Sequence, residues 1–206
     1  MATGYRVVPR LLSRFRQLAG LARVAAELEL ADKVVAVHQG MAAADVAHAF
    51  GGAIALAYYA EPRVTIDVDL NVFVPPENHA LVEAVLEDLG IAASLRAVER
   101  DGQERVMWGL TPLDLFFSYL PFHDAMRDAA SEVPFGSATI PILSAEHLVV
   151  CKALFDRPKD WLDIEQVATG VPDLDIAEVL HWVRDIVGET DPRHTRLRAV
   201  LGKGSG

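Results

Sequence analysis

The stretch that decides the fold is FGGAIALAYYAEPRVTIDVDLNVF, residues 50–73. Two glycines at residues 51–52 precede an alanine- and leucine-rich segment, which favours a helix that begins directly after them. The following β-branched residues predict a strand over Val64–Val74. Within that strand, Asp67 and Asp69 alternate with apolar side chains. Two carboxylates in an otherwise apolar strand therefore need an explanation.

Strand periodicity places the two carboxylates on the same side. Successive side chains of a strand point to opposite faces, so Asp67 and Asp69 share one face while Val68 and Leu70 occupy the other. Burying both carboxylates without a partner would cost several kcal/mol. Either they face water at an exposed strand, or a cation such as Mg²⁺ lies between them and brings substrate phosphates with it. This strand alone leaves both alternatives open.

Two further features favour a metal-phosphate site. Small residues at the start of a helix let a phosphate approach the free backbone N–H groups, and Gly51 and Gly52 stand at such a start. Asp114, in PLDLFFSY, is a third carboxylate in an apolar strand. We therefore expect the carboxylates to hold the metal and the glycines to hold the phosphate.

The remaining sequence indicates an α/β core followed by helices. Besides the elements above, the pattern predicts helices over Leu11–Leu21, Ala31–Ala47 and Asn78–Gly90, strands over Ala92–Val98, Arg105–Leu110 and Leu113–Tyr119, a hairpin turn at Asp101-Gly102, and a short β pair at Val133–Phe135 and Ala138–Ile142. From Ser144 onward, three helical segments are separated by proline or glycine. The predicted division is a core with N-terminal helices over residues 1–143 and a helical portion over 144–206.

Composition narrows the classes of protein. Of the 206 residues, 51% are apolar, which is enough for a sizeable core. A single cysteine excludes an internal disulfide and a thiolate metal cluster. The sequence has no signal-like segment and no run of about 18 uncharged apolar residues, so we expect a cytoplasmic protein without a membrane partner.

Charge argues against a general nucleic-acid-coating surface, because the formal net charge is −10. Arginines nevertheless crowd the N-terminus. They either contact phosphates locally or form the solvated face of an amphipathic helix. These arginines are Arg6, Arg10, Arg14, Arg16 and Arg23.

The residues around the glycines and aspartates resemble a known signature. Gly51-Gly52, Arg63, Thr65, Asp67, Asp69 and Asp114 together are similar to the signature of the DNA polymerase β-like nucleotidyltransferase superfamily. More narrowly, residues 50–73 and LSAEHLVVCKALFDRPKDWLDIE, residues 143–165, resemble the AbiE-type (AbiEii-like) nucleotidyltransferase toxins of bacterial abortive-infection and toxin-antitoxin systems. The similarity extends over residues 50–167.

This resemblance implies a fold and a set of roles. The fold would be a mixed β-sheet flanked by helices, with a helical C-terminal portion that closes over the nucleotide. By position, Asp67, Asp69 and Asp114 would bind two Mg²⁺ or Mn²⁺ ions, with Asp114 as the third ligand or as the base that activates the acceptor hydroxyl. Residues 51–52, with Arg63 and Thr65, would bind the nucleotide. Many relatives have Gly-Ser at this point, so here only backbone amides would contact the triphosphate.

The C-terminal motif adds further candidates. Lys152 lies among apolar neighbours in a helix, where a lysine either extends to solvent or meets an anion such as a triphosphate. Asp160 and Asp163 share one face of the next helix, and acids there either favour the helix dipole or serve the nucleotide. The resemblance implies catalytic or nucleotide-handling roles for all three residues.

The expected activity is transfer of a nucleoside monophosphate from a nucleoside triphosphate to an acceptor hydroxyl, with release of pyrophosphate. The resemblance implies that the acceptor is the 3′ end of tRNA and that the protein is a toxin with a cognate antitoxin. One alternative is a non-catalytic nucleotidyltransferase-like binding or regulatory module. The other is an enzyme that modifies a protein or an aminoglycoside-like small molecule. The sequence does not separate these acceptors.

Overall fold

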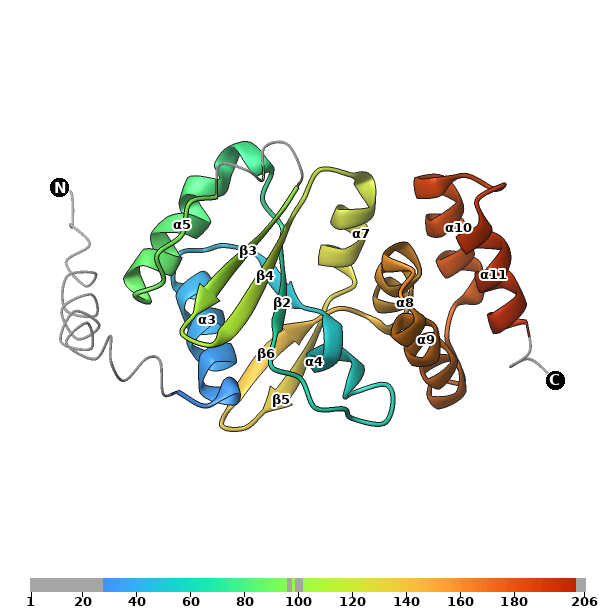
Figure 1. The fold of residues 1–206 in the computed structure, drawn as a ribbon, viewed down its shortest axis with the longest axis horizontal. Helices are drawn as coiled ribbons and strands as arrows, with labels where there is room; N and C mark the ends of the chain where they lie inside the picture. Colours follow the sequence, from blue (N-terminus) through green and yellow to red (C-terminus); the bar gives the residue numbers. More distant parts are fainter. Residues whose placement is uncertain (1–27, 96–97, 99–101, 203–206) are drawn as a thin grey trace, which may run out of the picture.

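In the computed structural model, which describes residues 28–95, 98 and 102–202, one mixed β-sheet lies between two groups of helices (Figure 1). Within this described part, six strands follow the order β3-β4-β2-β1-β6-β5. The expected fold class, a mixed sheet flanked by helices with a helical C-terminal portion, is therefore confirmed. The predicted helix over Leu11–Leu21 and the N-terminal arginines lie outside the described residues.

The sheet combines parallel and antiparallel pairs. Its strands are β1 (His48–Phe50), β2 (Val68–Val72), β3 (Gln103–Trp108), β4 (Thr111–Phe117), β5 (Ser131–Phe135) and β6 (Ala138–Ile142). Strand β2 runs parallel to β4 and antiparallel to β1, and β1 runs parallel to β6. The outer strands β3 and β5 pair antiparallel with β4 and β6.

Helices cover both faces of this sheet. The helical elements are α3 (Leu30–Ala43), α4 (Gly52–Leu56), η1 (Pro76–Asn78), α5 (His79–Asp88), α7 (Pro121–Asp128), α8 (Ala145–Phe155), α9 (Pro158–Gly170), α10 (Ile176–Val187) and α11 (Pro192–Leu201). Helices α3 and α5 lie on one side, whereas α4, α7 and α8 lie on the other (Figure 1). Helices α9, α10 and α11 pack around α8 and extend the molecule away from the sheet.

Apolar and polar side chains alternate along strand β2, so that one face joins the core and the other faces a pocket. Val68, Leu70 and Val72 of β2 are at most 2% exposed and join the hydrophobic core. The intervening Asp69 and Asn71 line a pocket on the opposite face. One face of β2 thus packs and the other carries polar side chains, as strand periodicity requires.

Strand β2 is shorter than the predicted Val64–Val74. Its partners explain the limits, because β1 pairs only with residues 70–72 and β4 only with residues 68–72. Without a neighbouring strand, residues 64–67 have no ladder to join, and Val64 is 93% exposed. Asp67 consequently lies just before the strand and not within it.

The prediction of a strand over Ala92–Val98 is wrong. Residues 92–95 have no regular structure, and Val98 is helical. Leu95 and Val98 are fully buried, so their apolar character reflects packing and not strand pairing. The hairpin predicted at Asp101-Gly102 is also misplaced, because β3 starts at Gln103 and turns into β4 at Gly109-Leu110, where Gly109 has φ +61°.

Other boundaries also differ from expectation. Helix α4 ends at Leu56, earlier than the alanine-rich segment suggested, and α3 ends at Ala43. Strand β1 and helix α11 were not predicted. The short β pair and the three helices after Ser144 are confirmed as β5, β6, α8, α9 and α10. The division into two domains stays a prediction.

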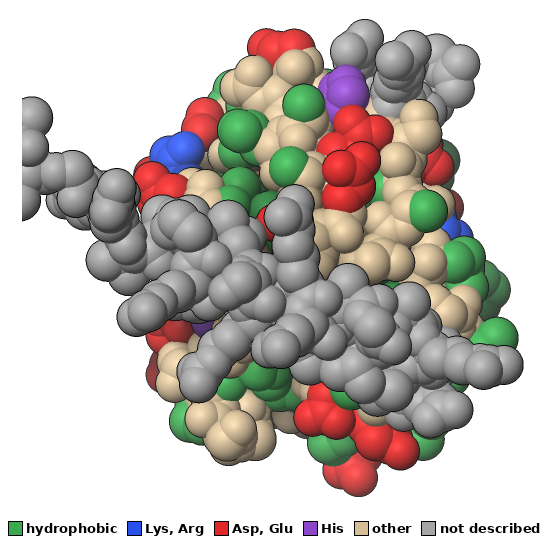
Figure 2. Space-filling model, turned by 90° about the vertical axis from the view of Figure 1, so that its left-hand side faces the viewer, with side chains coloured by type: hydrophobic (Ala, Val, Ile, Leu, Met, Phe, Trp, Pro, Cys, Tyr) green, Lys and Arg blue, Asp and Glu red, His purple; other side chains and the backbone are tan. Residues whose placement is uncertain are grey.

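One face of the molecule shows the acidic composition. Figure 2 shows the face over α3 and α5, where acidic side chains are spread over the visible surface with little lysine or arginine among them. Among the described residues, no helix combines the length and the apolar character that crossing a membrane requires.

Candidate functional site

The parallel pairing of β2 with β4 brings two of the predicted carboxylates together. Asp69 and Asp114 are direct register partners, so their side chains project from the same face of the sheet at the same level. Asp67 stands two residues before Asp69 and lines the same pocket. The structure therefore gathers all three predicted carboxylates at one place on the sheet.

The two glycines lie against Asp69. The Gly51 N–H donates to the backbone oxygen of Asp69 at 2.9 Å, which ties the turn between β1 and α4 to strand β2. Gly52 has φ +52°, and a Cβ built on it would overlap the Asp69 carboxylate. Only glycine combines this backbone conformation with such a close approach. This geometry gives a local reason for glycine at position 52, where many relatives in the resembled superfamily have serine.

The carboxylates perturb one another. Burial, together with the neighbouring charges of Asp67 and Asp114, raises the pKa of Asp69 from 3.8 to about 6. Burial alone would also raise the pKa of Asp67. The hydrogen bond from the Thr65 hydroxyl and the charges of Lys159 and Arg105 outweigh burial and lower it. Asp69 is therefore a half-buried acid whose negative charge is not fully compensated by its surroundings.

The third carboxylate has a partner that was not predicted. Arg105 lies directly across from Asp114 on strand β3, and its Nε and Nη2 atoms donate to the two carboxylate oxygens at 2.6 Å each. The Arg105 side chain is 59% exposed, whereas that of Asp114 is 14% exposed. In this arrangement, no group of three or more His, Cys, Asp or Glu side chains within the described ranges is positioned to hold a metal ion.

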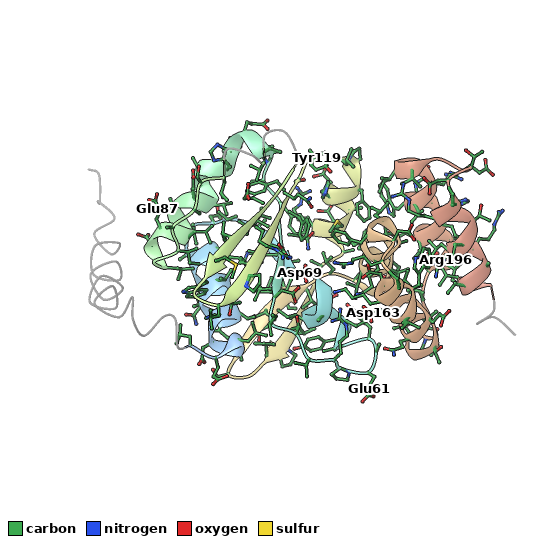
Figure 3. The ribbon with its side chains drawn as sticks, in the orientation of Figure 1. Glu61, Asp69, Glu87, Tyr119, Asp163 and Arg196 are labelled. Atoms are coloured by element: carbon green, nitrogen blue, oxygen red, sulfur yellow. The ribbon has the colours of Figure 1, made fainter. Side chains whose placement is uncertain are left out.

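Basic side chains face the carboxylates from the C-terminal helices. Lys152 of α8 is 3% exposed, and its Nζ donates to Asp163 Oδ2 at 2.6 Å. Arg63, from the loop before β2, reaches the same oxygen with Nη2 at 3.4 Å. Figure 3 shows Asp69 on the sheet and Asp163 on the helical side of the molecule. Asp163 thus holds Lys152 and Arg63, which both line the pocket, although Asp163 itself does not line it.

The predicted Asp160 has a different environment. It is fully buried, and its carboxylate accepts from the Arg157 side chain at 2.6 and 3.0 Å and from the Arg157 backbone N–H at 3.2 Å. The bond from the Arg157 backbone N–H to the Asp160 carboxylate caps the start of α9. It also directs Arg157 beside Lys159, and both of these residues line the pocket. The predicted catalytic roles of Asp160 and Asp163 stay predictions.

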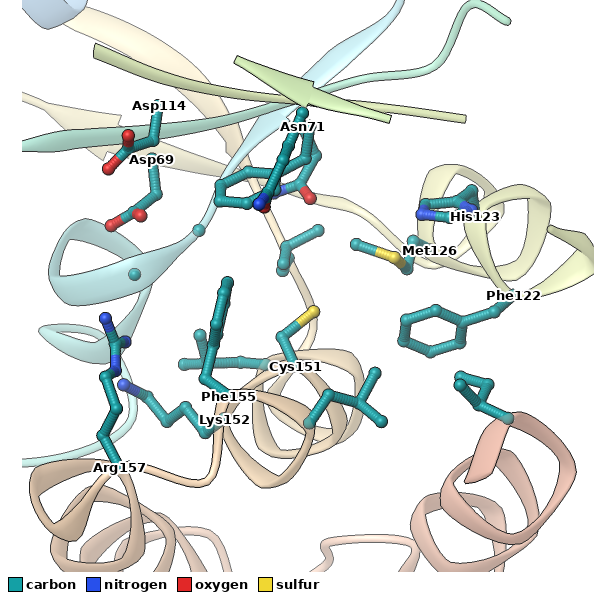
Figure 4. Close-up of a pocket in the computed structure, with 18 of the residues that line it drawn as sticks. Asp69, Asn71, Asp114, Phe122, His123, Met126, Cys151, Lys152, Phe155 and Arg157 are labelled. Carbon is teal, nitrogen blue, oxygen red and sulfur yellow. The ribbon is translucent and has the colours of Figure 1, made fainter. Parts of the chain in front are cut away.

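The pocket has a volume of about 250 Å³ and two chemically distinct ends. At one end, Asp69 and Asp114 face Lys152 and Arg157, as Figure 4 shows. The other end is aromatic and aliphatic, with Phe122, Met126 and His123 labelled in the same view. The pocket is lined by Gly51, Gly52, Arg63, Asp67, Asp69, Asn71, Gln103, Asp114, Phe116, Tyr119, Leu120, Phe122, His123, Met126, Leu143, Leu148, Cys151, Lys152, Leu154, Phe155, Arg157, Lys159 and Ile186.

Sequence reasoning found the carboxylates but missed several neighbours. Arg105 and Gln103 share one face of β3 through their spacing of two, yet only the register with β4 places them beside Asp114 and Phe116. Asn71 follows Asp69 by two residues, and this spacing alone could have indicated a pocket-facing side chain. The predicted Thr65 does not line the pocket and acts through Asp67.

Comparison with known proteins supports the fold. No protein-family model matches the chain, and a search of curated proteins gives no match. The antibiotic-resistance factor ANT(2'')-Ia superposes with a TM-score of 0.54 at 19% identity, over 84% of this chain and 96% of that protein. Its complex with adenylyl-2''-tobramycin gives a TM-score of 0.51 at 15% identity, with 82% and 97% covered.

A second protein shows the same likeness. An antigenic nucleotidyltransferase-like protein from Paracoccidioides brasiliensis superposes with a TM-score of 0.53 at 16% identity, over 86% of this chain and 88% of that protein. These similarities show that the chain has a nucleotidyltransferase-like fold. The narrower resemblance to AbiE-type toxins stays a prediction.

Proposed function

We propose that the protein is a nucleotidyltransferase that moves a nucleoside monophosphate from a nucleoside triphosphate to an acceptor hydroxyl. One observation carries this proposal. The β2-β4 register places Asp69 beside Asp114, with Gly52 against Asp69 and a basic wall across the same pocket. Acids on one wall and bases on the other match the needs of metal-assisted phosphoryl-type transfer.

The donor set fits a divalent metal. Carboxylate oxygens are the ligands that Mg²⁺ and Mn²⁺ prefer. Burial and, after it, the charges of Asp67 and Asp114 raise the pKa of Asp69, and a bound cation would offset both effects. When bound, such a metal would neutralise charge on the triphosphate and on the attacking and leaving oxygens. Asp67, Asp69 and Asp114 would hold it, provided that Arg105 releases Asp114 and Thr65 releases Asp67.

The helical wall would bind the triphosphate. Lys152 and Arg63 already share the single Asp163 carboxylate, so both cations keep donors for a second anion. Arg157 and Lys159 add charge at the same end of the pocket. Asp163 and Asp160 would then be positioning residues that fix these cations. Asp114 remains the candidate base for the acceptor hydroxyl.

The proposed acceptor is the 3′ end of tRNA, in a toxin that a cognate antitoxin restrains. The sequence resemblance to AbiE-type toxins supports this acceptor. The N-terminal arginines that would contact the RNA lie outside the described residues. The fold neighbour that carries adenylyl-tobramycin in its structure supports a small-molecule acceptor as the rival, so the assay below includes both.

A second candidate, a non-catalytic nucleotide-binding module, is favoured by the Arg105–Asp114 pair. A bidentate arginine occupies both oxygens of the third carboxylate and would block a metal or a base role if it never opened. A protein of this kind would bind nucleoside triphosphates without transferring them.

Incubation of the purified protein with α-labelled nucleoside triphosphates, Mg²⁺ and either bulk tRNA or aminoglycosides tests these proposals. We expect label on tRNA, and a loss of at least about a hundredfold in Asp69→Asn, because interactions with developing charge contribute on this scale. The exposed Asp173→Asn is the matched control and should retain full activity. Nucleotide binding without label on any acceptor would instead support the non-catalytic module.

A further inference from the structure

Next to the register pair Asp69–Asp114, a row of three side chains crosses the sheet. Phe116 of β4 is the register partner of Asn71 on β2 and of Gln103 on β3. This row lies two residues along the strands from the Asp69–Asp114 level, which corresponds to roughly 6.5 Å. All three side chains line the pocket. An aromatic ring thus stands between two carboxamides, one step from the proposed transfer site.

Asn71 is a buried polar side chain with an uncommitted oxygen. It is 6% exposed, and its Nδ2 donates to the Ala49 backbone oxygen at 3.4 Å. A carbonyl oxygen can only accept, so the amide nitrogen must face Ala49 and Oδ1 must face away from it. Figure 4 shows the Asn71 side chain extending into the pocket. Within the described part of the chain, Oδ1 accepts no hydrogen bond. Because Asn71 lines the pocket, this oxygen is available to accept a hydrogen bond from a ligand bound there.

The other two members of the row are also available to a ligand. The Gln103 carboxamide makes no hydrogen bond with any residue that the structure describes. The Phe116 ring meets Phe155 of α8 edge-on, with ring centroids 5.8 Å apart. Phe155 also carries the Arg157 guanidinium over its ring at 4.7 Å. These contacts connect the Phe116 ring to Arg157, one of the basic side chains that would bind the phosphates.

Beyond this row the pocket is uncharged. Phe122, Met126 and Leu148 are at most 3% exposed and line its inner end. Burial lowers the pKa of His123, and its Nδ1 accepts the Leu120 backbone N–H at 3.1 Å. Every carboxylate in the pocket belongs to the group at Asp67, Asp69 and Asp114. A polycationic ligand therefore finds no acid at this end, whereas a neutral planar ring finds both stacking and hydrogen-bonding groups.

We propose that the row Gln103–Phe116–Asn71 binds the base of the nucleoside triphosphate, with the ring stacked on Phe116 and an N–H of the base donated to Asn71 Oδ1. This inference rests on the proposed function. The base is favoured over the acceptor because the row continues directly from the carboxylates into the pocket. A ribose spans the step between a phosphate held at Asp69 and a ring held at Phe116.

Binding measurements on the full chain test the inference without relying on transfer. Isothermal titration calorimetry in Mg²⁺ compares each of the four ribonucleoside triphosphates with inorganic tripolyphosphate. We expect at least one nucleotide to bind more than about tenfold tighter than tripolyphosphate, since stacking of one base on an aromatic ring supplies this much. Phe116→Leu and Asn71→Leu should remove most of that preference and leave tripolyphosphate affinity within about twofold.

Two further variants separate recognition from folding. Gln103→Ala changes an exposed side chain and should weaken nucleotide binding less than Phe116→Leu, without lowering the melting temperature. Glu104→Gln alters the neighbouring residue on the opposite face of β3 and is the matched control, so its nucleotide preference should equal that of the unchanged protein.

Several results would overturn the inference. Nucleotides that bind no tighter than tripolyphosphate, or variants that keep the full preference, would show that the row does not bind the base. A variant effect on the KM for tRNA alone would assign the row to the acceptor instead. If the preference depends on Phe116 but no acceptor is ever labelled, the base site stands and the proposed transfer activity fails.

Discussion

Two pairs of aspartates, one in the pocket lining and one behind it on α9, differ in how their charge is balanced. Asp160 and Asp163 on α9 are both buried, and each accepts from basic side chains at 2.6 Å. Asp67 and Asp69 on the sheet side have a hydroxyl and a glycine turn as their nearest partners. Residues of the same type are thus paired with basic side chains in one region, whereas in the other region Asp69 keeps negative charge that its surroundings do not balance.

This difference distinguishes aspartates with a structural role from aspartates that could bind a metal. A buried carboxylate that is already paired stabilises its surroundings only as long as the partner remains. A carboxylate such as Asp69, whose pKa is raised by burial and by neighbouring carboxylates, has capacity to bind a cation, and such perturbed groups concentrate at functional sites. Under the proposed function, the helical pair therefore positions basic side chains and the sheet pair would bind the metal. The following predictions test this contrast.

The largest effect is expected for Asp163→Asn. This change leaves Lys152 charged and buried without a full counter-charge, which should lower the free energy of unfolding by about 3–5 kcal/mol. Urea unfolding measures the loss, with the exposed Asp173→Asn as control. A loss below about 1 kcal/mol would show that Asp163 does not stabilise the fold through this pair.

Asp69→Asn should have the opposite effect on stability. Because the folded-state pKa of about 6 lies above the ordinary 3.8, ionised Asp69 destabilises the fold. That penalty is absent below about pH 4, grows between pH 4 and 6, and is complete above pH 6. The asparagine should therefore raise the free energy of unfolding by up to about 3 kcal/mol at pH 8 in chelator, with little change at pH 4. Equal effects at the two pH values would contradict the raised pKa.

Arg105→Gln should strengthen metal binding by about tenfold, since a metal would no longer compete with a bidentate arginine for Asp114. Titration with Mn²⁺ followed by electron paramagnetic resonance measures the affinity directly. Arg127→Gln, which removes an exposed arginine paired with Asp124 and Asp128, is the control. Unchanged or weaker Mn²⁺ binding in Arg105→Gln would show that the arginine does not restrict the carboxylates.

The smallest effect is expected for Asp160→Asn. Its partner Arg157 is 50% exposed and can be solvated when the charge is lost, and an asparagine still accepts from the backbone N–H at the helix start. The free energy of unfolding should fall by only about 1 kcal/mol. A cost as large as that of Asp163→Asn would remove the distinction between an exposed and a buried partner.

Local sequence signals predicted several parts of the molecule well. The spacing of two between Asp67 and Asp69, the glycines before a helix and the apolar strand around Asp114 each indicated a site residue that the structure brings into one pocket. Failures occurred where tertiary contacts replaced local preference. Residues 92–95 form no strand, and within them only Leu95 is buried, through packing and not through strand pairing.

The sequence by itself determined which faces of the strands are polar and which helices follow the sheet, because both depend on periodicity along one segment. Only the tertiary structure decided that Asp114 lies beside Asp69, that Arg105 holds Asp114, and that Asn71, Phe116 and Gln103 form one row. Strand register depends on hydrogen bonds between segments far apart in the chain, and no local pattern encodes it. For the same reason, the presence or absence of a basic partner beside an aspartate depends on residues that are far from it in the sequence.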